Sequence, residues 1–233
     1  MIRLLQRMDD DVSRPPGPET TPAGHQLRYV TLLAEANEST EQALEDWARG
    51  LDWVGWLFSS IRRRMTHLHF QPPASTLLLH FQVAWEKFAQ ESLLSQLSPH
   101  LMKSWQLVEA MQLEDLISAD THFGATLSED ERAQSLEAGR LLLKATRGAR
   151  YQGILKQYRL AIEENRAPGH FLSVWAAVGH FFQLSLTNLM AEYLRLEWQT
   201  ATRDLPGHLP LANLPRLTSR LVKDHSTSLR VVL

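Results

Sequence analysis

The stretch SEDERAQSLEAGRLLLK, residues 128–144, decides the fold class of this chain. It opens with a capping box, in which the side chains of Ser128 and Glu131 each accept a hydrogen bond from the other residue's backbone N–H at the start of a helix. Acidic residues fill the first turn, where the helix dipole favours negative charge. The stretch therefore predicts a helix that ends near Lys144.

The residues after this helix predict more of the same structure. A run of apolar residues recurs at helical spacing, namely Tyr151, Ile154, Leu155, Tyr158, Ala161 and Ile162. This helix is expected to end before Pro168 and Gly169. The periodicity resumes at Phe171 and continues to about Arg203, with a break near Ser185, so this part forms one broken helix or two.

Three helices are predicted upstream. The first is a long amphipathic helix that follows a cap at Ser39 and ends near Arg62–Arg64. The second runs to about Gln96 on an apolar stripe of Leu77, Leu78, Phe81, Ala84, Trp85 and Phe88. A third restarts at Ser98-Pro99, because proline is tolerated in the first helical turn. Residues 113–124 are expected to form the end of this third helix and a turn.

The whole pattern predicts an all-α fold. No segment alternates apolar and polar residues with the period of a strand. Residues 1–28 are rich in proline and glycine, which disfavour both helix and sheet, so we expect a flexible N-terminal arm. Residues 29–233 are expected to form a single-domain α-helical bundle.

Composition excludes several classes of function. The 233 residues carry 24 basic and 26 acidic side chains, a net charge of −2, which does not favour nucleic-acid binding. Cysteine is absent, which excludes disulfides and thiolate metal sites. No stretch has the length of a signal-peptide core or a membrane span, so we expect a cytoplasmic protein without a membrane partner.

Motifs for catalysis, metal binding and cofactor binding are missing from the sequence. No glutamate is followed three residues later by histidine, the pairing that helical di-iron proteins use, which disfavours a helical oxidase or lyase. His67 and His69 are expected to be solvated or to complement a helix C-terminus rather than to bind metal. His170 and His180 are expected to be structural or interface residues. The chain is accordingly predicted not to be an enzyme and to need no cofactor.

Seven tryptophans raise the question of a binding surface. Most lie on or beside the apolar stripes, where packing in the core is the default expectation. Trp53 and Trp56 fit the stripe of their helix less well, so they are candidates for a patch that faces a partner.

The C-terminal half resembles the UreF family of urease accessory proteins. The family carries a helix of the type Ser-x-x-(Met)-Gly-Arg-x-Leu-Leu, matched here by Ser135, Leu136, Gly139, Arg140, Leu142 and Leu143. Further likenesses follow in order at His170, Val174–Ala177, Gly179, Tyr193-Leu194, Leu209–Asn213 and His225–Arg230. The family's glycine-rich turn after Leu4-Leu5-Gln6 is replaced here by a proline-rich stretch.

The resemblance implies a non-catalytic chaperone of metallocentre assembly. Such a protein binds UreD (UreH), recruits the GTPase UreG and docks on the urease apoprotein for nickel insertion, and it can form a homodimer. By resemblance, His225 and Arg230 pack into UreD. Gly139 allows two helices to approach closely, while Arg140 either caps a neighbouring helix or contacts a partner. The alternative is a helical interaction module or chaperone unrelated to urease.

Overall fold

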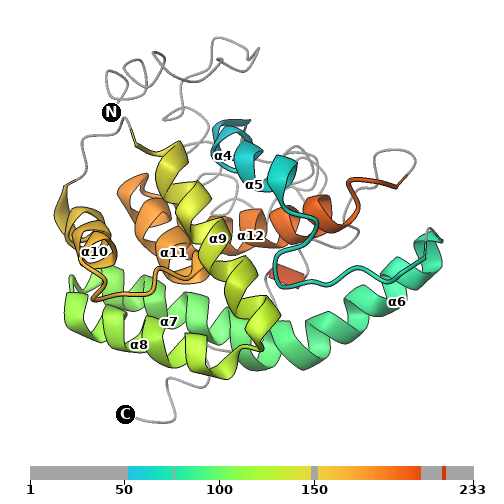
Figure 1. The fold of residues 1–233 in the computed structure, drawn as a ribbon, viewed down its shortest axis with the longest axis horizontal. Helices are drawn as coiled ribbons and strands as arrows, with labels where there is room; N and C mark the ends of the chain where they lie inside the picture. The colour runs from blue at the N-terminus through green and yellow to red at the C-terminus, as the bar shows by residue number, and fades with distance from the viewer. Residues whose placement is uncertain (1–51, 76, 148–151, 206–216, 219–233) are drawn as a thin grey trace, which may run out of the picture.

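Helices form every regular element among the residues that the structure describes (Figure 1). The structure is a computed structural model of the chain and describes residues 52–75, 77–147, 152–205 and 217–218. In chain order the elements are α4 (Asp52–Leu57), α5 (Ser59–Arg64), α6 (Leu78–Phe88), η1 (Ala89–Leu97), α7 (Ser98–Glu109), α8 (Leu113–Thr126), α9 (Glu129–Ala145), α10 (Gly153–Glu163), α11 (Phe171–Phe181) and α12 (Leu186–Ala201). The predicted all-α class is confirmed, while the predicted arm at residues 1–28 lies outside the described part.

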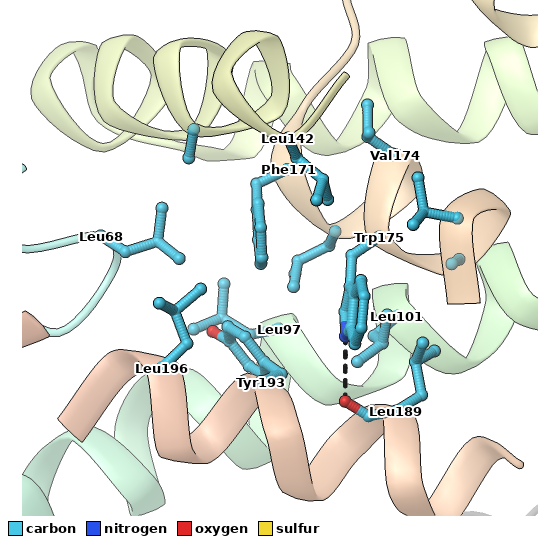
Figure 2. Packing of buried hydrophobic residues seen from close by; sticks show 14 of the residues in the cluster. Leu68, Leu97, Leu101, Leu142, Phe171, Val174, Trp175, Leu189, Tyr193 and Leu196 are labelled. Atoms are coloured by element: carbon cyan, nitrogen blue, oxygen red, sulfur yellow. Dashed lines mark hydrogen bonds between the residues drawn. The ribbon is translucent and has the colours of Figure 1, made fainter. Parts of the chain in front are cut away.

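Helix α11 lies at the centre of the bundle, packed against α9 and α7 (Figure 1). It is buried from Phe171 through Gly179, as expected for a helix that is apolar on nearly every side. Figure 2 shows its Trp175 in the middle of the apolar core, where the indole Nε1–H donates a 2.9 Å hydrogen bond to the carbonyl of Leu189 in α12. This bond joins the two helices and satisfies a buried polar group.

The elements α6, η1 and α7 follow one another without an intervening turn, from Leu78 to Glu109. The predicted start of a helix at Ser98-Pro99 is right, but the predicted break before it is wrong. A π-helical segment, η1, connects the two α-helices instead. Leu77 and Leu78 are also exposed rather than part of the buried stripe, which consists of Phe81, Trp85 and Phe88.

Residues 113–126 form a helix of their own, α8, and not the end of the preceding helix and a turn. Met111, which lies between the end of α7 at Glu109 and the start of α8 at Leu113, takes a left-handed backbone with φ of 57° that interrupts the helix. Glu114 and Asp115 then occupy the first turn of α8, where the helix dipole stabilises them. Its buried face, which includes Leu116 and Phe123, belongs to the core.

Two further expectations concern helix ends. The long helix predicted to end at Arg62–Arg64 does end at Arg64, but a turn at Phe58 divides its described part into α4 and α5. The break near Ser185 is real, and the Ser185 hydroxyl caps α12 by accepting a 3.2 Å bond from the backbone N–H of Asn188. No helix in the described ranges is both long and apolar enough to cross a membrane.

Candidate docking surface and the polar centre beneath it

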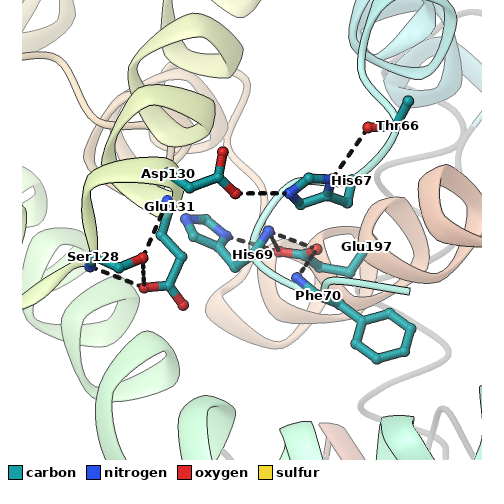
Figure 3. Close-up of polar contacts among 8 residues, drawn as sticks. All are labelled: Thr66, His67, His69, Phe70, Ser128, Asp130, Glu131 and Glu197. Carbon is teal, nitrogen blue, oxygen red and sulfur yellow. Dashed lines mark hydrogen bonds and ion pairs between the residues drawn. The ribbon is translucent and has the colours of Figure 1, made fainter. Parts of the chain in front are cut away.

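Helix α9 begins with the predicted capping box. The backbone N–H of Ser128 donates to the Glu131 carboxylate at 3.0 Å, and the N–H of Glu131 donates to the Ser128 hydroxyl at 3.3 Å (Figure 3). The cap fixes where α9 starts and therefore which of its residues face inward. Ser135, Ala138 and Gly139 lie on the buried side, and Arg140 is exposed.

Gly139 marks the closest approach of α9 to the loop that precedes α11. A Cβ atom at this position would collide with the backbone carbonyl oxygen of Gly169. Gly169 has φ of 81°, a backbone conformation that residues with a side chain rarely adopt. The close helix approach expected of Gly139 is therefore present, and its partner is the loop backbone at Gly169.

Ser135 joins α9 to the start of α11. Its hydroxyl oxygen accepts a 3.2 Å hydrogen bond from the backbone N–H of Phe171, one of the free donors at the beginning of that helix. The same oxygen lies 3.2 Å from Nε2 of His69, in the segment between α5 and α6. One buried hydroxyl thus connects three separate parts of the chain.

His69 is buried, and its interactions correct the expectation of a solvated side chain. Its Nδ1 lies 2.7 Å from Oε1 of Glu197 in α12, and the backbone N–H groups of His69 and Phe70 donate to the same carboxylate at 3.1 and 3.0 Å (Figure 3). The Tyr193 hydroxyl lies 3.2 Å from Nδ1. Burial and the nearby Glu197 charge raise the pKa of Tyr193 well above its usual value.

His67 interacts with a different carboxylate from the one that His69 contacts. Its Nε2 lies 3.2 Å from the exposed Asp130 carboxylate at the start of α9 (Figure 3). The two imidazoles of the His67-x-His69 pair therefore do not converge on one point. Within the described ranges, no group of three or more histidine, aspartate or glutamate side chains is placed to hold a metal ion.

A second buried carboxylate, Asp120 in α8, holds the other side of the loop before α11. Its Oδ2 accepts hydrogen bonds from the Tyr158 hydroxyl at 2.6 Å and from the backbone N–H of Gly169 at 2.8 Å. Burial raises the pKa of Asp120, and these donors work against that rise. Asp120 thereby ties α8, α10 and the loop together.

Two more histidines surround Phe123 in this centre. The ring of His100 stacks on it at 3.9 Å, and that of His170 meets it edge-on at 5.8 Å. His100 also bonds through Nε2 to the Ser173 hydroxyl at 2.9 Å. Burial, reinforced by the neighbouring histidines, lowers the pKa of His100 to about 3, so this imidazole is neutral in the folded protein. His170 is buried in the core region, while His180 lies partly exposed beside Trp105, with 5.5 Å between the ring centres.

Arg140 points away from this centre. Its guanidinium Nε donates to the Glu137 carboxylate at 2.7 Å, one turn earlier on the same exposed face. The bond to Arg140, together with the more distant charge of Arg64, lowers the pKa of Glu137. Within the described ranges Arg140 caps no neighbouring helix, which leaves contact with a partner as the role to be tested.

The remaining candidate residues are placed only in part. Trp56 is half-buried and packs against the core, which leaves some of its ring accessible. Trp53 lies in α4, but its side chain is outside the described part, and so are His225 and Arg230. Sequence reasoning missed the exposed apolar residues of α6, among them Leu79 and Val83, which are 66% and 60% exposed. The run Leu77-Leu78-Leu79 was the available signal, because three consecutive leucines cannot all face one side of a helix.

The fold and its polar centre define a class of protein, namely a helical scaffold. Buried ionisable side chains connect its helices, and other charged side chains, such as Arg140, are exposed on its surface. Comparison with family models matches residues 84–202, just over half of the chain, to UreF. The chain belongs to the UreF family of urease accessory proteins. The match spans the end of α6, η1 and α7 to α12, and it includes Asp120 and Glu197. Comparisons with curated proteins and with solved structures gave no match.

Proposed function

We propose that this protein binds UreD (UreH) and recruits the GTPase UreG, so that nickel is inserted into the urease apoprotein. The protein acts as a docking scaffold in that complex and performs no catalytic step itself. Family membership supports a role as a urease accessory protein, and the named partners are those that the family resemblance implies. The same proposal makes it a cytoplasmic chaperone of metallocentre assembly.

The observation that best supports the proposal is that neighbouring motif residues on α9 lie in different environments. Ser135 and Gly139 face inward and position the start of α11. Arg140, next to Gly139 in the same family motif, is exposed, and among the described residues it bonds to Glu137 on its own helix. The motif thus combines two residues that build the fold with one that the described fold does not need. Such a residue is suited to an interface.

The proposed interface residues are Arg140, Trp53, Trp56, His225 and Arg230. Arginine and tryptophan are the side chains that most often dominate the binding energy of protein interfaces. Arginine adds a planar fork of donors that matches carboxylates and carbonyl groups. These residues are proposed as contacts with UreD or UreG.

Co-expression tests the proposal directly. The full chain is produced with UreD and UreG, isolated by affinity pull-down, and tested for urease activation in a host that lacks its own UreF. We expect a complex that contains all three proteins, and restored urease activity. Omitting UreD is the control that shows whether UreG binds this protein alone. The proposal fails if no complex forms and urease matures equally well without this protein.

A further inference from the structure

The stretch of sequence directly after Glu137 carries several positive charges and no negative charge. Between Glu137 and Glu163 the chain has no acidic residue, while it has Arg140, Lys144, Arg147, Arg150, Lys156 and Arg159. Arg140 and Lys144 lie four residues apart on α9, the spacing that places side chains along one face of a helix, and Arg147 follows in the turn after the helix. Arg140, Lys144 and Arg147 are all exposed.

A second helix adds to this charge. Helix α5 packs against α9, and its last residue, Arg64, is exposed and close enough for its charge to lower the pKa of Glu137. Arg203 holds the end of α5 in place by donating from Nη1 to the carbonyls of Arg62 at 2.8 Å and Met65 at 3.1 Å. We call Arg64, Arg140, Lys144 and Arg147 the cationic face.

Helix electrostatics alone do not account for the cationic face. Lys144 lies in the last turn of α9, where a cation complements the helix dipole. Arg140 lies a turn earlier, and Arg64 belongs to another helix. Among the described residues, Glu137 forms an ion pair with Arg140 and also lies within the electrostatic reach of Arg64. An exposed pair such as Arg140–Glu137 stabilises a fold very little, so it can be exchanged.

We propose that the cationic face binds an acidic segment of a partner protein, with the Arg140 guanidinium exchanging the Glu137 carboxylate for one supplied by that partner. Bidentate pairing of arginine with a carboxylate gives the contact its geometry. Lys144, Arg147 and Arg64 provide the surrounding positive potential, which speeds association and makes it sensitive to salt. This inference rests on the proposed function, since it supplies the chemistry by which a maturation partner is recognised.

Charge elsewhere on α9 favours a short acidic segment over a long polyanion. The N-terminal turn of the same helix carries Glu129, Asp130 and Glu131, which repel a nucleic-acid backbone lying along the helix. The whole chain has a net charge of −2, so it offers no extended positive field. A local acidic segment meets the cations and avoids the acidic end.

The test uses the full chain and the double reversal Arg140→Glu/Lys144→Glu. The matched control is Lys87→Glu/Lys103→Glu, which changes net charge equally at two exposed positions on α6 and α7. Dissociation constants for purified UreD, UreG and urease apoprotein are measured in low and high NaCl, and circular dichroism verifies folding. We expect the double reversal to weaken at least one partner about 10- to 100-fold in low salt and to remove most of its salt dependence, while the control binds like wild type.

A fluorescein-labelled deca-glutamate peptide separates this inference from the proposed function. If every partner that binds wild type binds the double reversal equally well, the cationic face is not a partner site and the inference is overturned. If no partner binds wild type, the proposed function fails, and peptide binding then tests the cationic face by itself. Peptide binding in low salt by wild type and the control, but not by the double reversal, then supports the cationic face. Absent or equal peptide binding overturns it.

Discussion

Gly139 and Gly169 set the distance between α9 and the start of α11. Both glycines are needed for this contact. Gly139 lacks a Cβ atom, and the carbonyl oxygen of Gly169 lies where that Cβ would be. The positive φ of Gly169 turns that carbonyl toward α9, and the backbone N–H of the same residue donates to Asp120. Any side chain at position 139 must therefore displace backbone that is held from its other side.

Substituting Gly139→Ala should destabilise the protein by about 2–4 kcal/mol, since overpacking against fixed backbone outweighs the better helix propensity of alanine. Urea unfolding followed by circular dichroism measures the change. Gly55→Ala is the matched control, because among the described residues its Cβ would meet Arg62 Nη2 at an ordinary 3.6 Å. We expect the control to be neutral or slightly stabilising. Equal effects at both positions would show that the Gly169 contact is not what requires glycine.

The neutral His100 imidazole makes stability depend on pH. Its pKa is about 3 in the folded protein against 6.5 as the ordinary value, so below pH 6.5 the unfolded chain binds a proton that the folded protein does not. Stability is therefore lost as the pH falls. Burial also lowers the pKa of His170, in the same direction, whereas the raised pKa of Asp120 acts in the opposite direction. Comparison of variants separates these contributions.

Replacing His100→Gln should remove the contribution of this one imidazole. The difference in unfolding free energy between wild type and variant should shrink by about 2 kcal/mol between pH 7 and pH 5, at about 1.4 kcal/mol per pH unit below 6.5. Urea unfolding at several pH values provides the measurement. His80→Gln, at an exposed position on α6 and not among the groups that shift the pKa of His100, is the control and should leave the pH dependence unchanged. A constant difference between wild type and His100→Gln would show that His100 titrates normally.

The individual residues of the polar centre were predictable only in part. The family motif singled out Ser135 and Gly139, but their partners, Phe171 and Gly169, lie about 30 residues further along the chain. Local spacing contains no signal for such a pairing. His69 shows the same limit, because its arginine-rich neighbours suggest an exposed helix end, while its carboxylate partner is supplied by α12.

One carboxylate of α12 collects several hydrogen bonds from the segment between α5 and α6. Glu197 accepts two backbone N–H groups and the imidazole of His69, and all of these groups are buried. A carboxylate with three donors is a strong attachment, and its loss leaves those donors buried without an acceptor. The position of this segment therefore depends on α12.

Replacing Glu197→Gln should destabilise the fold by about 2–4 kcal/mol, because a neutral amide offers one acceptor oxygen and introduces donors where donors already converge. Limited proteolysis should also cleave residues 65–77 faster than in wild type. Glu137→Gln is the control and should change stability by less than about 1 kcal/mol, since Glu137 pairs only at the surface. Equal protease resistance of Glu197→Gln and wild type would contradict the proposed attachment.

The ends of helices were predicted correctly where neighbouring residues in the sequence mark the start or end of the helix. The Ser128 capping box, the Ser185 cap and the end at Arg64 are such signals. It failed at α8, where a left-handed Met111 ends one helix and another starts directly after it. It also failed at η1, because continuation of a helix through a π segment depends on packing rather than on residue pattern.

In the described part of the chain, the buried core includes residues from Val54 to Ala201, with Leu205 and Leu217 packed against it. The family match at residues 84–202 covers most of the same span. Residues 225–233 lie outside the described part of the chain. If the tail binds UreD, as the resemblance implies for His225 and Arg230, folding and binding should be separable.

Deleting residues 225–233 should abolish UreD binding and leave the helical content unchanged. Loss of the tail removes the Arg230 guanidinium, a donor suited to carboxylates and carbonyl groups on the partner. Pull-down with UreD and far-UV circular dichroism measure the two properties on the same preparation. The double substitution His225→Ala/Arg230→Ala keeps the length of the tail and tests its side chains, and we expect it to weaken binding nearly as much. A truncated protein that retains UreD at wild-type affinity would move the UreD site away from the tail and onto the surface of the bundle.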